Sequence, residues 1–249
     1  MSKKPIKHIT ILIYPHPELY PPTLSAIEEL SQIADTIDVV TRNMLASNWE
    51  YPKNVRVNYI NKKKYVGFGI EKVSFGLKII HFLKFVMMSH RLIKKNKSKI
   101  VLAYDVIPLY VAHLLKATLK KQDSLLWYHN HDVTDLSKAN YFSIMSIASR
   151  KQDSAIQNIG MFSLPSKERL VYFKNIPKEI NPIIIPNYPH KKVYSKHIKK
   201  EIKTTSRLKL VYQGSIGKGH GLESIIKILN QTINNKSLEL HLVGKIRAP

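Results

Sequence analysis

Short apolar runs alternate with longer amphipathic stretches along most of the chain. Several of the runs are apolar throughout, as strands are when helices cover both faces of a parallel sheet. The expected strands span residues 8–14, 36–42, 55–60, 99–105, 124–130, 161–165 and 183–186. The expected helices span residues 23–34, 71–96, 107–121, 137–153 and 166–175. The pattern predicts an α/β domain with a doubly wound parallel sheet.

This pattern stops at residue 187 and resumes at residue 208. The segment 188–207 between them is polar and basic, as is typical of a linker. After it come a strand (208–213), a helix (222–232) and a strand (238–243). The sequence therefore predicts an N-terminal domain over 1–187, a basic linker over 188–207, and the first βαβ unit of a second domain over 208–249. One such unit cannot cover both faces of its sheet, so we expect an incomplete second domain.

Lysine dominates the charge of the chain. There are 40 Lys and Arg residues against 17 Asp and Glu, which gives a formal net charge of +23, and only seven of the basic residues are Arg. This charge favours phosphates, nucleic acid or an anionic membrane surface as partners. A composition rich in Lys, Ile and Asn is also what an AT-rich genome encodes, and both explanations stay open. We expect no specific nucleic-acid partner, because arginine is scarce and no nucleic-acid-binding motif is present.

The chain contains no cysteine, which excludes disulfides, thiolate-bound metals and thiol nucleophiles. No apolar stretch reaches the roughly 18 residues that a membrane-spanning helix needs. The N-terminal apolar run is too short for a signal peptide. We therefore expect a cytoplasmic protein, either soluble or peripheral on the inner face of the membrane.

A glycine-rich turn over residues 214–221 joins a predicted strand to a predicted helix. Glycines let a backbone approach a ligand closely, and free N–H groups at a helix start attract phosphate. A flexible turn with a solvated lysine explains the pattern equally well, because the spacing matches no established phosphate-binding motif. The candidate phosphate-binding residues are Gly214, Ser215, Gly217, Lys218 and Gly219.

A group of titratable residues lies at the end of the predicted strand 124–130. It comprises His129, His131, Asp132 and Asp135. Open α/β sheets bind ligands at the carboxyl ends of their strands. Imidazoles and carboxylates together can bind a metal, relay protons or hydrogen-bond sugar hydroxyls. A third zinc ligand at a familiar spacing is not evident, so no metal site is expected.

Two further segments are candidates for binding. The loop 15–22 carries four prolines, and its residues His16, Glu18 and Tyr20 either line a cleft or belong to a stiff connection. The predicted helix 71–96 carries basic residues on one face and apolar residues on another. Such a helix either lies on an anionic membrane or packs on its own sheet with a solvated lysine face. Its candidate membrane-surface residues are Lys78, Lys84, Arg91, Lys94 and Lys95.

The order of these motifs resembles that of the family-four glycosyltransferases, which have the GT-B fold of two Rossmann-like domains. Segment 127–135 is similar to the family's strand that ends in a His-Asp or His-Glu pair. Segments 162–170 and 183–189 look like its serine-headed helix and its apolar strand ending in Pro-Asn. Segments 208–222 and 238–244 are similar to the opening of its nucleotide-sugar domain.

The resemblance implies transfer of a sugar from a nucleotide-sugar donor to a glycan or lipid-linked saccharide, with retention at the anomeric carbon. The nucleotide sugar is a substrate, and no cofactor is implied. His131 matches the histidine that contacts the donor sugar, and Asp132 is its orienting neighbour. Lys218 matches a lysine that contacts the donor diphosphate. The candidate donor-binding residues are then Gly214, Ser215, Gly217, Lys218 and Gly219. The acceptor is assigned to the N-terminal domain, with His16, Glu18, Tyr20 and His129.

Three departures from the family pattern limit the resemblance. Ser215 replaces an arginine of the diphosphate clamp, and a proline-rich loop replaces the family's first glycine pair. The family's pair of donor-binding glutamates lies downstream of a strand that ends here at Val243, close to the last residue. We therefore expect a hexosyltransferase whose donor domain is incomplete in this chain. The sequence is then a truncated piece of an enzyme, or a separate chain supplies the rest, or it is a remnant without activity. The alternative is a non-catalytic basic module that binds an anionic membrane surface or another polyanion.

Overall fold

The computed structural model divides the chain into two compact units, which are described separately. Unit 1 is Met1–Ser195 and unit 2 is Lys196–Pro249, so the division falls within the predicted linker segment. The structure describes residues 6–45, 49–62, 74–133, 140–188, 195, 207–214, 216–217, 221–229, 232–233, 236–244 and 246.

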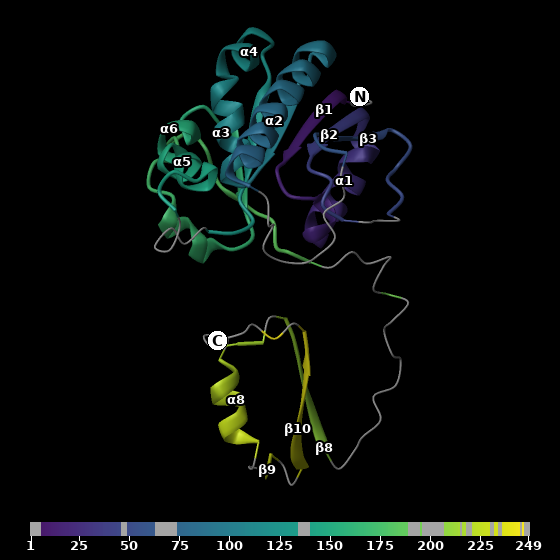
Figure 1. The fold of residues 1–249 in the computed structure, drawn as a ribbon, viewed down its shortest axis with the longest axis vertical. Coiled ribbons are helices and arrows are strands. Elements are labelled where there is room, and N and C mark those ends of the chain that lie inside the picture. Colours follow the sequence, from purple (N-terminus) through teal and green to yellow (C-terminus); the bar gives the residue numbers. More distant parts are fainter. Residues whose placement is uncertain are drawn as a thin grey trace. The chain divides into compact units, whose positions relative to one another are not determined.

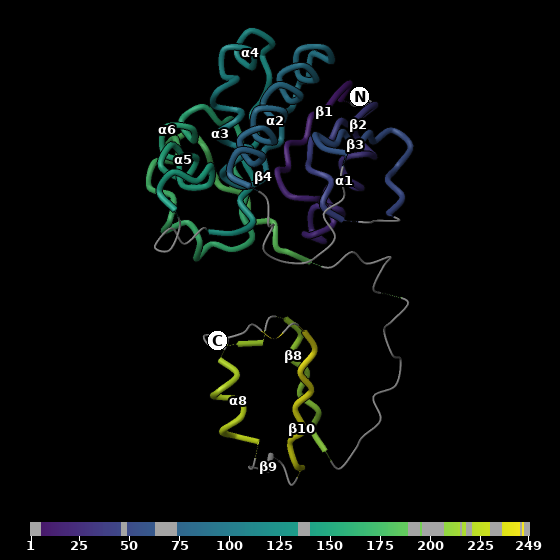
Figure 2. The backbone as a smooth tube through the Cα atoms, in the orientation of Figure 1, coloured from purple at the N-terminus to yellow at the C-terminus, as the bar shows by residue number. Residues whose placement is uncertain are grey.

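Unit 1 is built on a seven-stranded parallel sheet in the order β3-β2-β1-β4-β5-β6-β7 (Figure 1). The strands are β1 (Ile6–Ile13), β2 (Ala34–Thr41), β3 (Val55–Tyr59), β4 (Ile100–Tyr104), β5 (Leu125–His129), β6 (Met161–Leu164) and β7 (Ile183–Ile184). β1 has β2 on one side and β4 on the other. β2 and β3 therefore extend the sheet in one direction, and β4 to β7 extend it in the other (Figure 2). The parallel α/β sheet predicted from the apolar runs is confirmed.

Helices cover both faces of this sheet. They are α1 (Pro21–Ile33), α2 (Phe75–Asn96), α3 (Val106–Leu114), α4 (Lys116–Lys121), α5 (Ile144–Arg150) and α6 (Gln152–Ile156). α1 packs on one face through Ile27 and Leu30. The other helices pack on the opposite face around Phe85 and Leu109. Because both faces are covered, β1 is buried from His8 onward.

Three of the predicted helices of unit 1 differ from the structure. Residues 140–143 form a turn, because the Ser143 hydroxyl accepts a hydrogen bond from the Ser146 N–H (3.1 Å) and starts α5 only at Ile144. The predicted helix 107–121 is interrupted at Leu115, between α3 and α4. The segment predicted as helix 166–175 forms the 3₁₀ helix η2 (Lys167–Tyr172), of which no residue is buried. Among its side chains Leu170 alone packs against the core, and a short segment with so few apolar contacts gains little from an α-helix.

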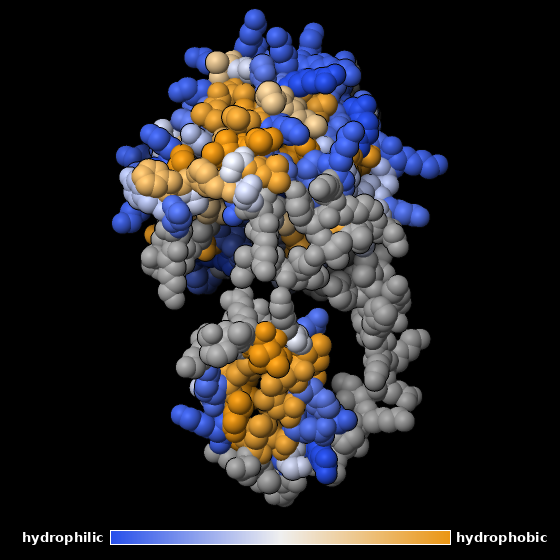
Figure 3. All heavy atoms as spheres, in the orientation of Figure 1, coloured by the Kyte–Doolittle hydropathy of each residue, from blue (hydrophilic) through white to orange (hydrophobic). Residues whose placement is uncertain are grey.

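Unit 2 contains a small sheet and one helix. The strands are β8 (Arg207–Gln213), β9 (Thr232–Ile233) and β10 (Lys236–Val243), and the helix is α8 (Leu222–Ile228). β8 and β10 are parallel, and β9 joins β10 antiparallel, so the predicted helix 222–232 ends four residues early. Among the described residues of unit 2 only Leu222 is buried. Large apolar side chains such as Val211, Ile226 and Val243 stay exposed, as the apolar surface in Figure 3 shows.

Candidate functional site

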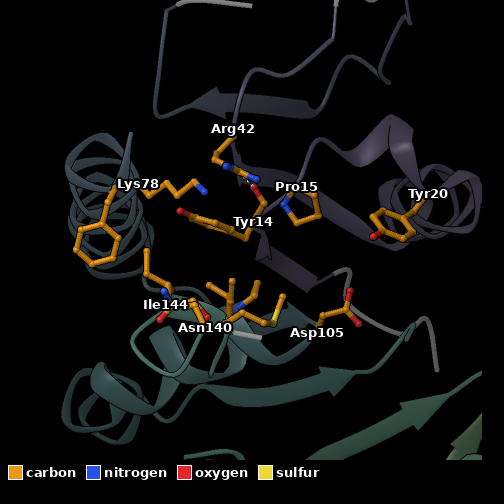
Figure 4. A pocket seen from close by; sticks show the side chains of 13 residues that line it. Tyr14, Pro15, Tyr20, Arg42, Lys78, Asp105, Asn140 and Ile144 are labelled. Carbon is orange, nitrogen blue, oxygen red and sulfur yellow. Dashed lines mark hydrogen bonds between the residues drawn. The ribbon is translucent and has the colours of Figure 1, made fainter. Parts of the chain in front are cut away.

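A pocket of about 420 Å³ opens in unit 1 between the segments that follow β1 and β4. β1 and β4 are the neighbours at which the strand order reverses, and open α/β sheets bind ligands at this point. Tyr14 and Tyr20 contribute from the first loop and Asp105 from the end of β4, with further walls from α2 and α5. Figure 4 shows Asp105 on one side of the pocket, and Arg42 and Lys78 on the opposite side.

Asp105 has an unusual backbone conformation. It follows β4 directly and precedes α3, with φ 65° and ψ −179°. Only glycine adopts this region readily, and another residue there costs about 1–3 kcal/mol. Its N–H donates to the carbonyl of His129 (2.9 Å), which ties the end of β4 to the end of β5. Strain of this kind is concentrated at functional sites.

The Asp105 carboxylate is held by one oxygen. Oδ1 accepts hydrogen bonds from the N–H groups of His131 (2.7 Å) and Asp132 (3.4 Å). Within the described residues no hydrogen bond reaches Oδ2, and Asp105 lines the pocket. Burial raises the pKa of Asp105 to about 6, and the two backbone hydrogen bonds oppose that rise. The result is an oriented carboxylate that changes charge just below neutral pH.

His131 is buried beside this carboxylate. Its Nε2 lies 3.0 Å from the hydroxyl of Thr23 on α1, and its ring stacks on Tyr20 and Tyr104 at centroid distances of 5.5 and 4.9 Å. Burial lowers the pKa of His131 to about 4, against the opposing effects of Asp132 and the Asn187 side chain. The histidine is therefore neutral at physiological pH. Tyr20, which stacks on it, lines the pocket.

His129 lies deeper, at the end of β5. Its Nδ1 is 2.7 Å from the Ser163 hydroxyl on β6, which also accepts a hydrogen bond from Trp127 Nε1 (2.7 Å). Burial lowers the pKa of His129 to about 3. The structure does not bring His129 to the pocket wall, because it is enclosed by Tyr104, His131 and Ser163.

Asp132 is the exposed member of the cluster. Its Oδ1 forms an ion pair with Arg169 of η2 (3.5 Å), and the same guanidinium donates to the carbonyl of His131. Arg169 therefore ties the His-Asp segment to the strand–η2 segment that carries part of the family resemblance. Asp135, the fourth member, lies outside the described residues.

The three candidate residues of the loop 15–22 lie in different surroundings. Tyr20, just after the 3₁₀ helix η1 (Pro17–Leu19), lines the pocket. His16 is fully buried and stacks on Tyr59, with ring centroids 5.7 Å apart. Glu18 accepts a hydrogen bond from the Tyr51 hydroxyl (3.4 Å). Of the three, only Tyr20 is brought to this pocket.

In the glycine-rich turn, the structure describes Gly214 and Gly217 but not Ser215, Lys218 or Gly219. The Gly214 N–H donates to the carbonyl of Val243 (2.9 Å). A Cβ on Gly244 would collide with the Gly214 backbone, so glycine is required there by close approach of two chain segments. The phosphate-binding assignment stays a prediction.

The five basic residues of α2 fall into two groups. Lys78 lines the pocket opposite Asp105 (Figure 4), and Lys84, Arg91 and Lys95 line a second hollow. Lys94 belongs to neither group and is exposed. The helix packs on the sheet through His81, Phe85, Ser89 and Ile93. None of the helices in the described part of the chain has the length and apolar character needed to span a membrane.

Sequence reasoning missed Asp105 and Arg42 as site residues. Both end a predicted strand, 99–105 and 36–42, so their place at the carboxyl edge was available from the pattern. Their meeting in one pocket depends on the strand order, which the pattern does not give. In the described ranges no group of three or more His, Asp and Glu side chains is placed to hold a metal ion.

No family model matches the sequence, and no curated protein matches it. Solved structures do match. The chain is similar to the sucrose-phosphate synthase of Thermosynechococcus elongatus, with a TM-score of 0.57 and 13% identity over 96% of this chain and 62% of that one. It is similar to UGT2 of Phytolacca americana complexed with UDP-2fluoro-glucose and pterostilbene, with a TM-score of 0.55 and 8% identity over 100% of this chain and 73% of that one.

A third similar structure is the UDP-GlcNAc 2-epimerase of Methanocaldococcus jannaschii, with a TM-score of 0.50 and 14% identity over 94% of this chain and 65% of that one. The fold is Rossmann-like α/β of the GT-B class. This confirms the predicted fold class, and at these identities the likeness establishes the fold alone. The chain spans 62% of the length of the sucrose-phosphate synthase.

Proposed function

We propose that this chain takes part in transferring a sugar from a nucleotide-sugar donor to a hydroxyl-bearing acceptor. The observation that carries the proposal is the pocket at the β1–β4 switch point, where a strained and half-buried Asp105 follows β4. Two of the similar proteins are associated with nucleotide sugars, since UGT2 is complexed with UDP-2fluoro-glucose and the epimerase is named for UDP-GlcNAc. The resemblance of the sequence motifs supports the same reaction class.

In this proposal the pocket of unit 1 holds the acceptor. Asp105 Oδ2 receives a hydrogen bond from an acceptor hydroxyl, and its anchored Oδ1 fixes the direction of that bond. Tyr14, Tyr20 and the apolar walls pack against the acceptor. His131 and Asp132 are proposed to contact the donor sugar, and Gly214, Ser215, Gly217, Lys218 and Gly219 to hold its diphosphate. The acceptor is a glycan or a lipid-linked saccharide.

The test is nucleotide release from UDP-, GDP- and ADP-sugars in the presence of saccharide and lipid-linked acceptors. Asp105→Asn should raise the acceptor KM and lower turnover about 100-fold, since an oriented charged hydrogen bond is lost. Lys218→Ala should raise the donor KM about tenfold. Asp153→Asn, an exposed carboxylate on α6, is the matched control and should behave as the parent. Parental rates in both site variants would contradict these assignments.

We propose retention at the anomeric carbon, as the sequence resemblance implies. The anomeric configuration of the product, read by NMR, tests this. In a retaining transfer the leaving phosphate takes the acceptor proton, and Asp105 only orients the hydroxyl. An inverted product would contradict retention and would make Asp105 the general base.

We also propose that α2 lies on an anionic membrane surface. It exposes Ile80 (48%), Leu83 (52%) and Met87 (63%) beside its basic residues. Figure 3 shows an apolar band in the part of unit 1 where Figure 1 draws α2. The alternative of a purely polyanion-binding module gives no role to the strained carboxylate in the pocket, so it is not favoured.

A further inference from the structure

Between α2 and the end of β3 lies a hollow in which three cations meet an apolar surface. The hollow has a volume of about 530 Å³. Lys84, Arg91 and Lys95 line it together with Met87, Met88, Leu92, Ile60 and Asn58. The cations are spaced seven and four residues apart, which places them on one face of the helix. It is separate from the pocket beside Asp105, with which it shares no lining residue.

The part of the chain that the structure describes does not neutralise these cations. Within the described residues none of the three forms an ion pair, and no Asp or Glu lines the hollow. The carboxylate that contacts the lining residue Asn58 is Asp38, which is buried. It is already bound by Arg56 (2.8 Å), Asn96 (2.7 Å) and Asn58 (2.9 Å). The hollow is therefore strongly positive and suited to a compact anion.

Apolar side chains lie next to this charge. Met87 both lines the hollow and is well exposed, and Ile80 and Leu83 are exposed two turns and one turn before it on the same helix. Methionine adapts its shape to irregular apolar partners. A free phosphate or nucleotide would leave these apolar side chains in water. A molecule that is anionic at one point and carries hydrocarbon beside it would cover both features.

We propose that this hollow binds the phosphate headgroup of an anionic phospholipid in a membrane, with the acyl chains against Ile80, Leu83 and Met87. The inference deepens the membrane-surface location proposed for α2 and is independent of sugar transfer. Lys84, Arg91 and Lys95 donate to the phosphate oxygens, and the helix lies parallel to the membrane surface.

The test is sedimentation of the full chain with phosphatidylcholine vesicles, with and without phosphatidylglycerol. The site variant is Lys84→Gln/Arg91→Gln/Lys95→Gln, and the apolar variant is Leu83→Ser/Met87→Ser. The matched control, Lys151→Gln/Lys174→Gln/Lys178→Gln, removes the same charge from exposed positions elsewhere on unit 1. Circular dichroism checks that each variant is folded.

We expect the parent to bind only the vesicles that contain phosphatidylglycerol. The site variant should lose about 100-fold in affinity, because each basic residue at an anionic surface contributes about 1 kcal/mol. The control should lose much less, since distant charges are screened, and the apolar variant should weaken binding at every salt concentration. Equal losses of affinity in the site variant and the control would overturn the assignment of the hollow as the headgroup site, while the membrane location of α2 would stand. A parent that sediments with neither kind of vesicle would overturn the lipid assignment and the membrane location together, with the sugar-transfer assay unaffected.

Discussion

At the scale of single residues, Asp105 is a position where the fold gives up stability. Its backbone occupies a region that disfavours side chains, and partial burial raises the pKa of its carboxyl to about 6. A residue under both costs is retained where geometry matters more than stability. The two N–H groups that hold Oδ1 explain how the side chain keeps one orientation.

Replacing this carboxyl by its neutral isostere should stabilise the protein. The folded-state pKa of Asp105 is about 6, above the ordinary 3.8, so its contribution to stability is fully present below pH 3.8 and is lost as pH rises through 6. At neutral pH, Asp105→Asn should raise the free energy of unfolding by about 1–3 kcal/mol. Urea denaturation above and below the pKa measures this. A gain of the same size at low pH would mean that charge is not the cause.

The same group should set the acid limb of activity. Ionised Asp105 accepts the acceptor hydroxyl, so kcat/KM for the acceptor should fall as pH drops below about 6. The pKa values of His129 and His131, about 3 and 4, lie too low to cause this limb. The residual activity of Asp105→Asn should lack the limb, and Asp132→Asn should keep it. A limb that persists in Asp105→Asn would assign it to another group.

At the scale of elements, α2 shows how two faces of one helix serve different purposes. The face carrying His81, Phe85, Ser89 and Ile93 is buried on the sheet, while Ile80, Leu83 and Met87 point outward. The sequence predicted the helix and its basic residues. Which apolar residues would be covered was decided by packing, because the helix has more apolar positions than the sheet can bury.

Truncating the two faces should therefore have very different effects. Phe85→Ala removes a fully buried ring beside Tyr14 and should lower the free energy of unfolding by about 3–5 kcal/mol. Leu83→Ala, an exposed position on the same helix, should change it by about 0.5 kcal/mol or less. Chemical denaturation of both variants provides the comparison. Similar losses would show that the Leu83 face is covered in solution.

At the scale of the whole molecule, the two units differ in how well they are buried. Unit 1 has helices on both faces of its sheet, and unit 2 has one helix and exposed apolar strands among its described residues. The free energy that opens a segment follows the burial of its side chains and hydrogen bonds. The sheet of unit 2 should therefore open far more readily than that of unit 1.

Hydrogen exchange read by mass spectrometry can compare the two sheets directly. Amides of β1 and β4 should exchange orders of magnitude more slowly than those of β8 and β10, since the first pair lies in a core closed on both sides. The comparison is internal to one sample, so pH and temperature cancel. Equal protection of the two pairs would indicate that the apolar face of unit 2 is covered in solution.

The sequence by itself determined the parallel α/β sheet of unit 1 and the approximate position of each of its strands. It did so because a strand buried on both faces must be apolar throughout, and this is visible residue by residue. It also identified His131, Asp132 and Tyr20 as neighbours of one edge of the sheet. The sequence did not predict the early end of α8 or the turn at 140–143. Pairing of β9 with β10 outweighs helix propensity after α8, and capping by Ser143 outweighs it at the turn.

Only the tertiary structure decided what lines the pocket. Asp105, Arg42 and Lys78 come from three elements that are far apart in the chain, and they meet because β4 pairs with β1. The sequence predicted that the cations of the α2 hollow share one face of the helix. It did not predict that they lack acidic partners among the described residues. Strand order and the choice of buried face are set by long-range packing, and no local pattern of residues encodes them.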